Sequence, residues 1–550
     1  MHKLETKLRE VISSGLKRRS ITKCSTWALN CRVMGPPFPG PWSFDHHPWT
    51  RAMHDCNDEM VVGQKAAQMG FTEWALNKAF YHIDIMGESV LYVLPASTPD
   101  ATDFSTSRFD PALELSPHLR NLFSDVKNVG HKRAGNANLF VRGSRSKSQM
   151  RSIPAPRLIF DEVDVMIQEN IILAFERASG QVDKQFLLLS TPTIDNFGIN
   201  SYFKGSTQDH FMFKCPCCSR LTELIFPECL EITAEEESDP AITNTFIKCK
   251  DCGGKLEHED KINFLRNGEW VSSYTNRLAH GYHINQLYSM TVKPYELARL
   301  YLKSTSNPAA EQEFYNGKLG LPHIVAGARI TDVMLEECTG NIKKLDSPPL
   351  NSFIVMGVDV GGWLHYEITQ YYMNDNQMLT NDIHLSSKAR IITEGKVREF
   401  EELDLLMRQY GILFCVIDAN PERRKALEFA KRFYGHVRLC FYGNGVSGKQ
   451  IHLHDESEHT MTVDRTSWLD LSLARFKNQS IILPIDLDVE YKDNIKALVR
   501  IYEKDKSGNQ VGRYVKGNDD DHYAHARSYN EMAFGLASGL GGSKDSDISL

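Results

Sequence analysis

Two adjacent carboxylates end an apolar run in the N-terminal half of the chain. Leu158, Ile159 and Phe160 are typical of a buried strand in a parallel sheet, and Asp161 and Glu162 follow them directly. At the end of such a strand, Asp161 can hold a Mg²⁺ ion and Glu162 can polarise a water molecule, the two roles that phosphoanhydride hydrolysis requires. An apolar strand before a solvated acidic turn is common, however, so the pair alone predicts no function.

A loop of small residues earlier in the chain has the features of a phosphate site. The segment from Val61 to Glu73 runs from an apolar stretch through a loop with Gly70 into a helical pattern. A strand, a loop and a helix N-terminus together present free N–H groups to an anion. The standard G-x-x-x-x-G-K-[ST] pattern is absent because Phe71 holds the lysine position; Lys65 can supply the cation and Thr72 the hydroxyl for Mg²⁺. An ordinary strand–turn–helix is the alternative.

Further polar residues extend this predicted nucleotide site. The apolar run from Phe186 to Leu189 ends in Ser190 and Thr191, whose hydroxyls can sense a γ-phosphate. A basic loop contains Arg142 and Arg145, which are candidates for a cis arginine finger or for phosphate contacts. A solvated loop explains these arginines equally well.

A second set of carboxylates lies in the C-terminal half. Asp359 and Asp418 each end an apolar run, and Asp520 and Asp521 precede a helical stretch. Two metal ions about 4 Å apart need bridging carboxylates to activate water and to stabilise the leaving oxygen of a phosphodiester. Two strand ends and a helix start predict an RNase H-like nuclease, with Asp359 and Asp418 as ligands and Asp521 or Asp520 as the third. His522 can assist, although each of these residues alone is explained as well by a cap or an exposed helix position.

Two pairs of cysteines have the spacing of zinc knuckles. The other cysteines are scattered, which indicates a reduced compartment rather than a disulfide framework. Two C-x₂-C pairs can hold one structural Zn²⁺ through four thiolates, and reduced cysteines in a loop are the alternative. The predicted ligands are Cys215, Cys218, Cys249 and Cys252, with Cys217 spare.

Length, composition and charge limit the number of domains and the class of protein that carries these sites. A chain of 550 residues exceeds a single core and should divide into several domains. Apolar residues make up 41% and charged residues 24%, as in globular proteins. No apolar run is long enough to cross a bilayer, so we expect a soluble, intracellular protein without membrane contact. The net charge of −7 excludes a generally basic nucleic-acid coat and leaves only local basic patches for DNA.

The order of these parts resembles the large terminase subunit of tailed bacteriophages. Pro48-Trp49, the Lys65 loop, the Asp161 strand end and Ser190–Thr193 follow one another as in that family, and the stretch from Gly281 to Tyr288 continues the likeness. The lambda-like branch is the most similar, since its P-loop also carries the lysine early. The resemblance implies that the Trp49 ring lies near the adenine.

From the motifs and the resemblance together we expect an α/β multidomain protein. A P-loop NTPase-type parallel-sheet ATPase would be followed by a zinc-knuckle insertion and an RNase H-like nuclease. The predicted boundaries are an N-terminal arm and linker at 1–45, the ATPase at 46–210, the insertion with a helical subdomain at 211–345, the nuclease at 346–535 and a flexible tail at 536–550.

The resemblance also implies the function and the partners. An ATP-driven motor would translocate duplex viral DNA into a procapsid, and its nuclease would cut concatemers, with ATP, Mg²⁺ or Mn²⁺ and Zn²⁺ as cofactors. A small terminase subunit, the portal and other copies of the chain in a ring would be its partners in the host cytoplasm. Two alternatives stay open from the sequence: a repair or transposition ATPase–nuclease without a capsid, and a non-catalytic DNA-binding scaffold.

Overall fold

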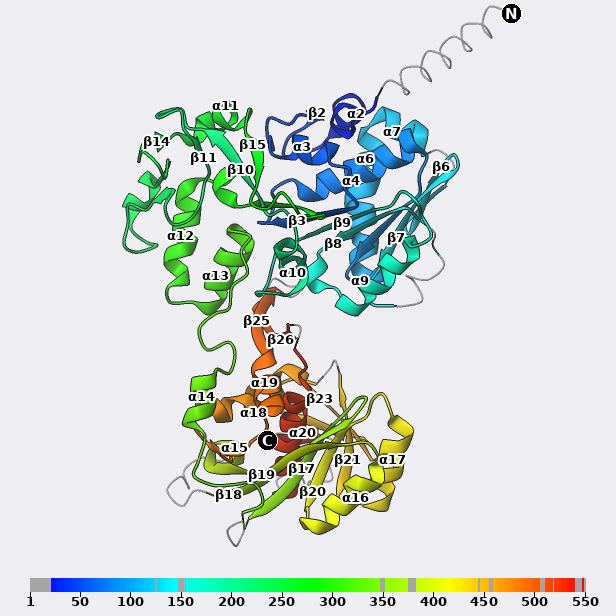
Figure 1. Cartoon of the computed structure of the whole chain (residues 1–550), viewed down its shortest axis with the longest axis vertical. Coiled ribbons are helices and arrows are strands. Elements are labelled where there is room, and N and C mark those ends of the chain that lie inside the picture. Colours follow the sequence, from blue (N-terminus) through cyan, green and yellow to red (C-terminus); the bar gives the residue numbers. More distant parts are fainter. Residues whose placement is uncertain are drawn as a thin grey trace, which may run out of the picture. The chain divides into compact units, whose positions relative to one another are not determined.

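The structure is a computed structural model in which two compact units, 1–325 and 326–550, can be described separately (Figure 1). The predicted N-terminal arm up to residue 20 and most of the predicted tail lie outside the described residues. The residues that the structure describes are 21–123, 126–146, 153, 155–346, 352–373, 382–443, 446–454, 459–504, 510–517, 519–539 and 547–548.

The first unit is built on one large sheet with a parallel centre. Its strands follow the order β11-β10-β16-β3-β9-β8-β4-β7-β6-β5, with β15 beside β10. All neighbours from β10 to β7 are parallel, and the antiparallel strands lie at the two edges. The parallel strands are β3 Met60–Lys65, β4 Val90–Leu94, β7 Ala137–Gly143, β8 Arg157–Asp161, β9 Gln185–Ser190, β10 Asp209–Lys214 and β16 His280–Ile284; the edge strands are β5 Val126–Asn128, β6 His131–Ala134, β11 Leu221–Thr222 and β15 Glu269–Ser272.

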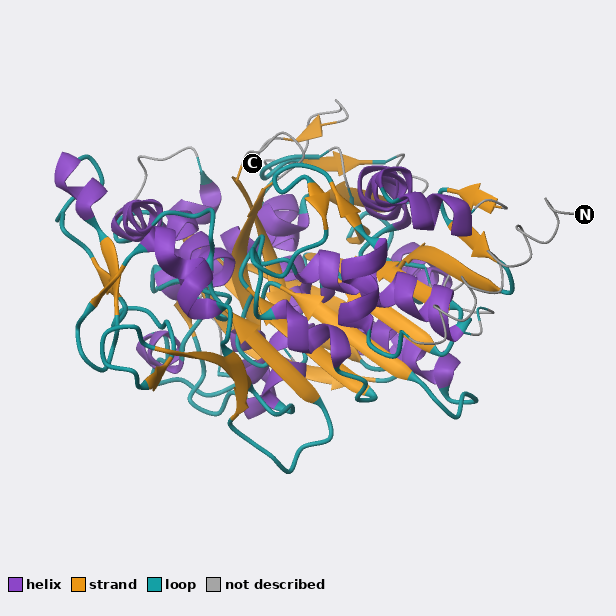
Figure 2. Ribbon diagram, turned by 90° about the horizontal axis from the view of Figure 1, so that it is seen from above, coloured by secondary structure: helices purple, strands orange, loops and turns teal. Residues whose placement is uncertain are grey.

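Helices cover both faces of this sheet, which explains why its central strands are apolar throughout (Figure 2). Along β8, Ile159 packs into the core on the α4 face, while Leu158 and Phe160 pack with Ile171 of α9 and Ile199 of α10 on the other. The helices are α2 Cys24–Cys31, α3 Thr50–Asp55, α4 Phe71–Tyr81, α5 Thr102–Phe104, α6 Asp110–Leu115, α7 Pro117–Leu122, α9 Gln168–Phe175, α10 Gly198–Lys204, α11 Lys261–Leu265, α12 Pro294–Ser304 and α13 Pro308–Gln312.

The predicted insertion at 211–345 shares the sheet of the predicted ATPase segment. β16 pairs in parallel with β3, from His280 opposite Val61 to Ile284 opposite Lys65. β10 in turn pairs with β16, and a separate three-stranded sheet carries the second cysteine pair. Long-range pairing of this kind leaves no local signal in the sequence. The small strands are β1 Val33–Met34, β2 Gly40–Pro41, β12 Leu230–Glu231, β13 Phe246–Lys248 and β14 Lys255–Leu256.

The second unit has a mixed sheet in the order β24-β19-β18-β17-β20-β21-β23-β22-β27. β17, β18 and β19 form an antiparallel meander, and β20 and β21 then add in parallel on the other side of β17. The strands are β17 Phe353–Val360, β18 Leu364–Met373, β19 Ser387–Val397, β20 Phe414–Asp418, β21 Val437–Tyr442, β22 Ile451–Leu453, β23 Thr460–Val463, β24 Ile481–Ile482, β27 Asp547–Ile548 and the separate hairpin of β25 Leu498–Lys504 and β26 Gln510–Lys516.

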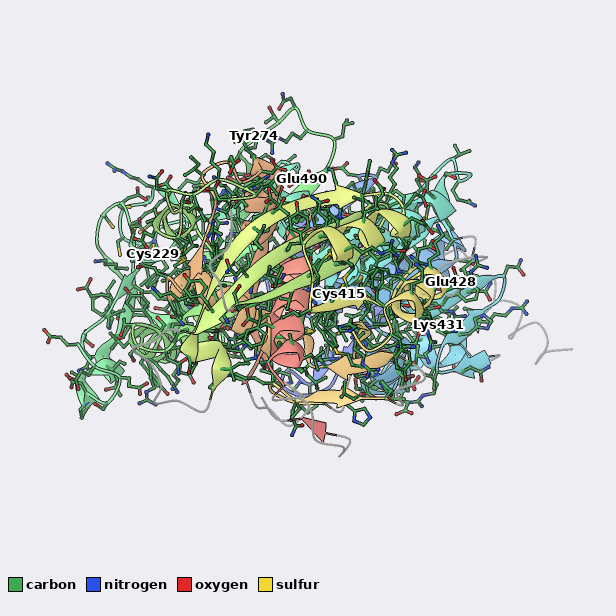
Figure 3. All side chains as sticks on the ribbon, turned by 90° about the horizontal axis from the view of Figure 1, so that it is seen from below. Cys229, Tyr274, Cys415, Glu428, Lys431 and Glu490 are labelled. Atoms are coloured by element: carbon green, nitrogen blue, oxygen red, sulfur yellow. The ribbon has the colours of Figure 1, made fainter. Side chains whose placement is uncertain are left out.

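Two helical layers enclose this second sheet as well. On one face Met356 and Ile417 pack with Leu403 of α16 and Phe429 of α17. On the other face Val355 packs with residues of α18 and α20, and α20 is buried along most of its length. Cys415, labelled in Figure 3, belongs to the buried centre of β20. The helices are α14 Asp332–Glu337, α15 Ile383–Ser386, α16 Phe400–Gln409, α17 Arg423–Arg432, α18 Arg465–Lys477, α19 Val489–Ala497 and α20 His522–Ala537.

Candidate ATPase, nuclease and metal sites

The predicted ATPase residues meet at one edge of the first sheet. β3 ends at Lys65, β8 ends at Asp161, and β9, which ends at Ser190, lies between them. Because parallel strands point in the same direction, their carboxyl ends share an edge, where open α/β sheets bind ligands. Residues about a hundred positions apart in the sequence therefore lie at the same edge of the sheet.

Lys65 faces the acidic pair. Its buried Nζ lies 3.3 Å from Oε1 of Glu162. Burial lowers the pKa of Lys65, but the carboxylates of Glu162 and Asp161 outweigh burial and raise it. The side chain is therefore held as a cation at the front of the loop, as neutralisation of phosphates requires.

The two carboxylate oxygens of Asp161 have different surroundings. Its Oδ2 accepts a hydrogen bond from the Tyr92 hydroxyl at 2.7 Å, whereas its buried Oδ1 meets no donor among the described residues. Burial and the nearby Glu162 raise the pKa of Asp161 to about 6, against the opposing effects of Lys65 and Thr72. An unpartnered carboxylate oxygen near a threonine hydroxyl fits a divalent cation, which prefers such oxygen ligands.

Glu162 has a strained backbone. Its φ is 67° and its ψ is 52°, in the left-handed region that residues other than glycine rarely adopt. The Glu162 N–H donates to the carbonyl of Leu189 at 2.9 Å, which holds β8 against the end of β9. The Glu162 side chain is 42% exposed while Asp161 beside it is buried, so the two adjacent acids lie in different environments.

Ser190 belongs to a hydrogen-bond network around Asp164. The buried Ser190 hydroxyl accepts from the Asp164 N–H at 3.2 Å. The Asp164 carboxylate accepts from the N–H and the hydroxyl of Thr193 and from the N–H of Ile199, each at 2.8 Å. Thr191, the other predicted sensor, is partly exposed. The network ties the end of the acidic strand to the loop at 191–199.

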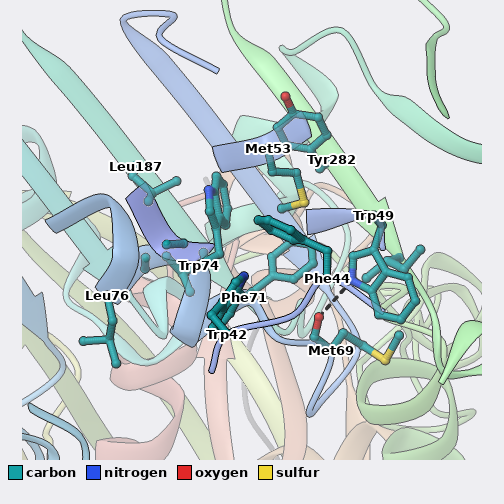
Figure 4. Close-up of a cluster of buried hydrophobic side chains, with 14 of the residues drawn as sticks. Trp42, Phe44, Trp49, Met53, Met69, Phe71, Trp74, Leu76, Leu187 and Tyr282 are labelled. Atoms are coloured by element: carbon teal, nitrogen blue, oxygen red, sulfur yellow. Dashed lines mark hydrogen bonds between the residues drawn. The ribbon is translucent and has the colours of Figure 1, made fainter. Parts of the chain in front are cut away.

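The loop between β3 and α4 is supported from beneath by aromatic side chains (Figure 4). Gly70 has a φ of +82°, and a Cβ there would lie 2.9 Å from the His47 ring, so the turn into α4 requires glycine. The indole N–H of Trp49 donates to the Met69 carbonyl at 2.9 Å, and the Trp49 ring is fully buried. In this arrangement Trp49 supports the loop and presents no open face to an adenine.

The two candidate arginines differ in their surroundings. Arg142 donates to the carbonyls of Gly130 and Val141 and lies over the Phe140 ring at 5.6 Å. Arg145 is exposed in the turn that follows β7, at the same edge of the sheet as Lys65. An arginine finger at position 142 would have to leave these protein contacts, so the surroundings favour Arg145.

The predicted nuclease carboxylates gather at the edge of the second sheet. Val358 of β17 pairs with Ile417 of β20 in parallel register, so Asp359 and Asp418 follow side by side on strands about 4.8 Å apart. Burial and the charge of Asp359 raise the pKa of Asp418 to about 6, although the N–H of Asn420 donates to its Oδ1 at 3.1 Å. Two carboxylates this close favour a bound cation between them.

The third predicted carboxylate lies at the start of α20. Asp521 is buried, and its oxygens lie 3.0 Å from Nζ of Lys516 and 3.3 Å from Nε2 of His525. Although burial raises the pKa of Asp521, His525 and Lys516 outweigh burial and hold it well below its usual range. Its neighbour Asp520, the alternative third carboxylate, is exposed.

Two histidines flank Asp359, and sequence reasoning missed one of them. His522 Nδ1 lies 2.8 Å from Asp359 Oδ2, and His365 stands directly opposite Asp359 across the β17–β18 hairpin. Ligand atoms of Asp359, His365 and His522 lie within 4.8 Å of one another. The glycines at the turn from Gly361 to Trp363 could have predicted this neighbour, because a hairpin with that turn pairs Asp359 with His365.

The cysteine pairs form a compact four-sulfur cluster. Ligand atoms of the four predicted cysteines lie within 4.8 Å of one another, and Cys215 Sγ lies 4.0 Å from Cys252 Sγ. Thiolates bound to one Zn²⁺ at about 2.3 Å lie about 3.8 Å apart in a tetrahedron. The exposed Cys217 stays outside and points to the Lys255 carbonyl.

The two knuckles have the same backbone. In each, the first cysteine N–H donates to a carbonyl five residues on and its carbonyl accepts from an N–H four residues on, in both cases at 2.8 to 2.9 Å. The fourth residue after that cysteine, Ser219 or Gly253, has a positive φ of 61° or 69°. Burial raises the pKa of the Cys249 thiol, but the N–H groups of Asp251 and Cys252 outweigh it and lower that pKa to about 7. The cluster therefore fits a tetrahedral metal ion.

Comparisons with known families match both units of the chain. Residues 37–270 match a family described as phage terminase large subunit gpA, ATPase domain, and residues 279–506 match terminase large subunit gpA, endonuclease domain. The chain belongs to the phage terminase large subunit family. As a terminase large subunit it carries an ATPase and an endonuclease that use ATP and divalent metal ions, and it packages viral DNA into a capsid. This assignment favours the packaging enzyme over the repair enzyme and the scaffold.

Solved structures of other phage terminases are similar at low identity. The large terminase of bacteriophage HK97 is 11% identical, with 93% of this chain and 99% of that chain covered and a TM-score of 0.46. The large terminase ATPase domain of a Thermus phage is 13% identical, with 49% of this chain and 91% of that chain covered and a TM-score of 0.30. The large terminase nuclease of thermophilic phage G20c is 14% identical, with 36% of this chain and 95% of that chain covered and a TM-score of 0.23. No curated protein matches this terminase.

Both matching families carry the gpA designation, which is consistent with the lambda-like branch. Among the described residues, no helix is both long enough and apolar enough to span a bilayer. The nuclease match ends at residue 506, before Asp520 and Asp521.

Proposed function

We propose that ATP is hydrolysed at the edge formed by Lys65, Asp161 and Glu162. The observation that carries this proposal is the buried Asp161, whose Oδ1 has no partner among the described residues, next to a Glu162 that a strained turn directs to solvent. Mg²⁺ at Asp161 and Thr72 would withdraw charge from the β- and γ-phosphates. Glu162 would orient the attacking water and accept its proton, and Lys65 would leave the acidic pair to neutralise the phosphates.

The residues around this centre would couple hydrolysis to movement. The N-terminus of α4 with Gly70 would receive the phosphates, supported by Trp49 from beneath. A γ-phosphate near Ser190 and Thr191 would compete with the hydrogen bonds around Asp164 that hold the loop at 191–199. Arg145, exposed at the same edge, is our preferred arginine finger over Arg142.

We also propose that Asp359 and Asp418 bind the divalent metal of the nuclease, Mg²⁺ or Mn²⁺, with Asp521 as the third carboxylate. Their position side by side at the sheet edge supports this assignment. Asp521, paired with Lys516 and His525, would have to exchange these partners for the metal, and the exposed Asp520 is the alternative. The metal would lower the pKa of a bound water and stabilise the leaving oxygen.

The four-cysteine cluster would hold a structural Zn²⁺, since all four positions are filled by thiolates and none is left for a substrate. The motor would hold duplex DNA through its phosphates, because translocation cannot depend on base sequence. A small terminase subunit would then choose the site, and a ring of this chain on the portal, in the host cytoplasm, would be the working assembly.

A pair of variants tests the two centres against each other. Glu162→Ala should abolish DNA-stimulated ATP hydrolysis and leave metal-dependent DNA cleavage, whereas Asp359→Ala should do the reverse. Full ATPase activity of Glu162→Ala would contradict the proposed ATPase site. Undiminished cleavage by Asp359→Ala would show that the nuclease carboxylates lie elsewhere.

A further inference from the structure

The nuclease edge contains two imidazoles that the carboxylates do not explain. His365 is 4% exposed, and its Nδ1 is buried without a hydrogen-bond partner in the part of the chain that the structure describes. Leaving a polar atom buried and unpaired destabilises the folded protein, so such an atom favours a ligand. His365 Nε2 lies 3.8 Å from Glu490 (labelled in Figure 3), whose carboxylate already accepts from Lys396 at 2.7 and 2.8 Å.

The fold places the two rings beside Asp359. His365 is cross-strand to Asp359 in the β17–β18 hairpin, so both side chains leave the same face of the sheet. His522 begins α20 and stacks on His365, with ring centroids 4.5 Å apart and planes 4° apart. Its Nδ1 lies 2.8 Å from Oδ2 of Asp359.

We propose that His365 and His522 are metal ligands and form, with Asp359, a nitrogen-containing cation site in the nuclease. This rests on the proposed nuclease function and names the metal class of that site. Ligand atoms of the three residues lie within 4.8 Å of one another, and a turn of one imidazole about its Cβ–Cγ bond would bring them within the roughly 4.2 Å that a single ion bound at about 2.1 Å can span. Asp359 would join this ion to a second, oxygen-only position at Asp418, which is the bridging geometry of a two-metal site.

The ligand chemistry determines which cation binds. Imidazole nitrogen favours first-row transition ions, whereas Mg²⁺ prefers carboxylate and water oxygens in octahedral geometry. The site with His365 and His522 should therefore take Mn²⁺ or a later transition ion in preference to Mg²⁺. Mg²⁺ would be accepted at the Asp418 position.

The test uses Mn²⁺ and the untagged full chain in a buffer without nitrogen ligands. Pulsed EPR of bound Mn²⁺ should show coupling to ¹⁴N, and labelling histidine with ¹⁵N should shift it. The coupling should disappear in a His365→Ala/His522→Ala variant and persist in His525→Ala, which removes the partner of Asp521 instead. Wild-type protein without nitrogen coupling, or coupling unchanged in the double variant, would overturn the proposal.

A milder variant guards against misfolding. His522 is only half-buried at the helix start, so His522→Gln should keep its circular dichroism while the ratio of cleavage rates in Mn²⁺ and in Mg²⁺ falls by about tenfold or more. An unchanged ratio would contradict the inference. If Asp359→Ala stops cleavage while the histidine variants leave both readouts unchanged, only this inference fails; if Asp359→Ala still cuts, the proposed nuclease function fails.

Discussion

Nζ of Lys65 lies 3.3 Å from Oε1 of Glu162, although 97 residues separate them in the sequence. Lys65 precedes the loop and Glu162 follows the acidic strand, so the contact joins the phosphate cradle to the residue proposed to activate water. In this structure the lysine contacts Glu162, and we expect its charge to move to the phosphates when a nucleotide binds.

This relationship predicts different defects at its two ends. Lys65→Met should weaken binding of a fluorescent ATP analogue, because the cation for the phosphates is lost. Glu162→Gln should retain binding and lower the hydrolysis rate by about 10²- to 10⁴-fold, the range that a general base contributes. Binding titrations and single-turnover hydrolysis separate the two, and equal binding by both variants would contradict the role of Lys65.

The third nuclease carboxylate can be identified by a matched pair. Asp521→Asn should lower metal-dependent cleavage by at least about tenfold, because the substitution removes the charge of a buried carboxylate at the proposed nuclease metal site. Asp520→Asn changes an exposed neighbour and should leave most of the activity. A plasmid-nicking assay in Mg²⁺ and in Mn²⁺ compares them; the reverse order would make Asp520 the ligand.

The cysteine cluster predicts one zinc ion per chain. Cys249→Ser should lose the metal and lower the melting temperature, because three remaining thiolates cannot close the tetrahedral site. Cys217→Ser is the control, since Cys217 lies outside the cluster. Elemental analysis of both variants measures the loss, and zinc retained at full occupancy by Cys249→Ser would exclude the proposed ligand set.

A buried charge network should dominate the stability of the second unit. Arg527 donates to Glu367 at 2.6 Å and also binds Glu531, which in turn pairs with Arg475 at 2.6 Å; all of these are buried. Arg527→Met would leave the buried carboxylate of Glu367 without its cationic partner and should lower the free energy of unfolding by about 3–5 kcal/mol. Urea unfolding measures this loss of stability, and Arg423→Met, a substitution of an exposed arginine, is the control. Equal unfolding midpoints for the Arg527 and Arg423 variants would show that the network contributes little.

His118 predicts a pH dependence in the first unit. A hydrogen bond to Asp84 at 2.5 Å, with a contribution from Cys31, raises the pKa of His118 from 6.5 to about 9. Because the folded pKa lies above the unfolded one, its contribution to stability is complete below pH 6.5 and is lost as the pH rises through about 9.

The magnitude of this effect follows from comparing variants. Because His118 is partly exposed, its ion pair is screened by solvent. We therefore expect the free energy of unfolding of wild type to exceed that of His118→Gln by about 1 kcal/mol near pH 6 and to equal it above the folded pKa. Urea unfolding of both proteins across this range gives the difference. A difference that is constant with pH would mean that the pair is not charged in the folded state.

The sequence by itself determined the local parts of this protein. Apolar runs ending in Asp161, Asp359 and Asp418 mark buried strands with acidic ends because a strand covered on both faces loses its polar alternation. The spacing of the two cysteine pairs fixes two equivalent knuckles. The order of the motifs along the chain was enough to indicate the family, which the two domain matches then established.

Only the tertiary structure decided which of these parts meet. The strand order puts β9 between β3 and β8, so Ser190 lies between Lys65 and Asp161, and a parallel β16 joins the predicted insertion to the same sheet. The hairpin register brings His365 opposite Asp359. Pairing between strands that are distant in the sequence, such as β16 with β3, depends on long-range packing and leaves no periodic signal in either strand, so those neighbours could not be predicted from the residues alone.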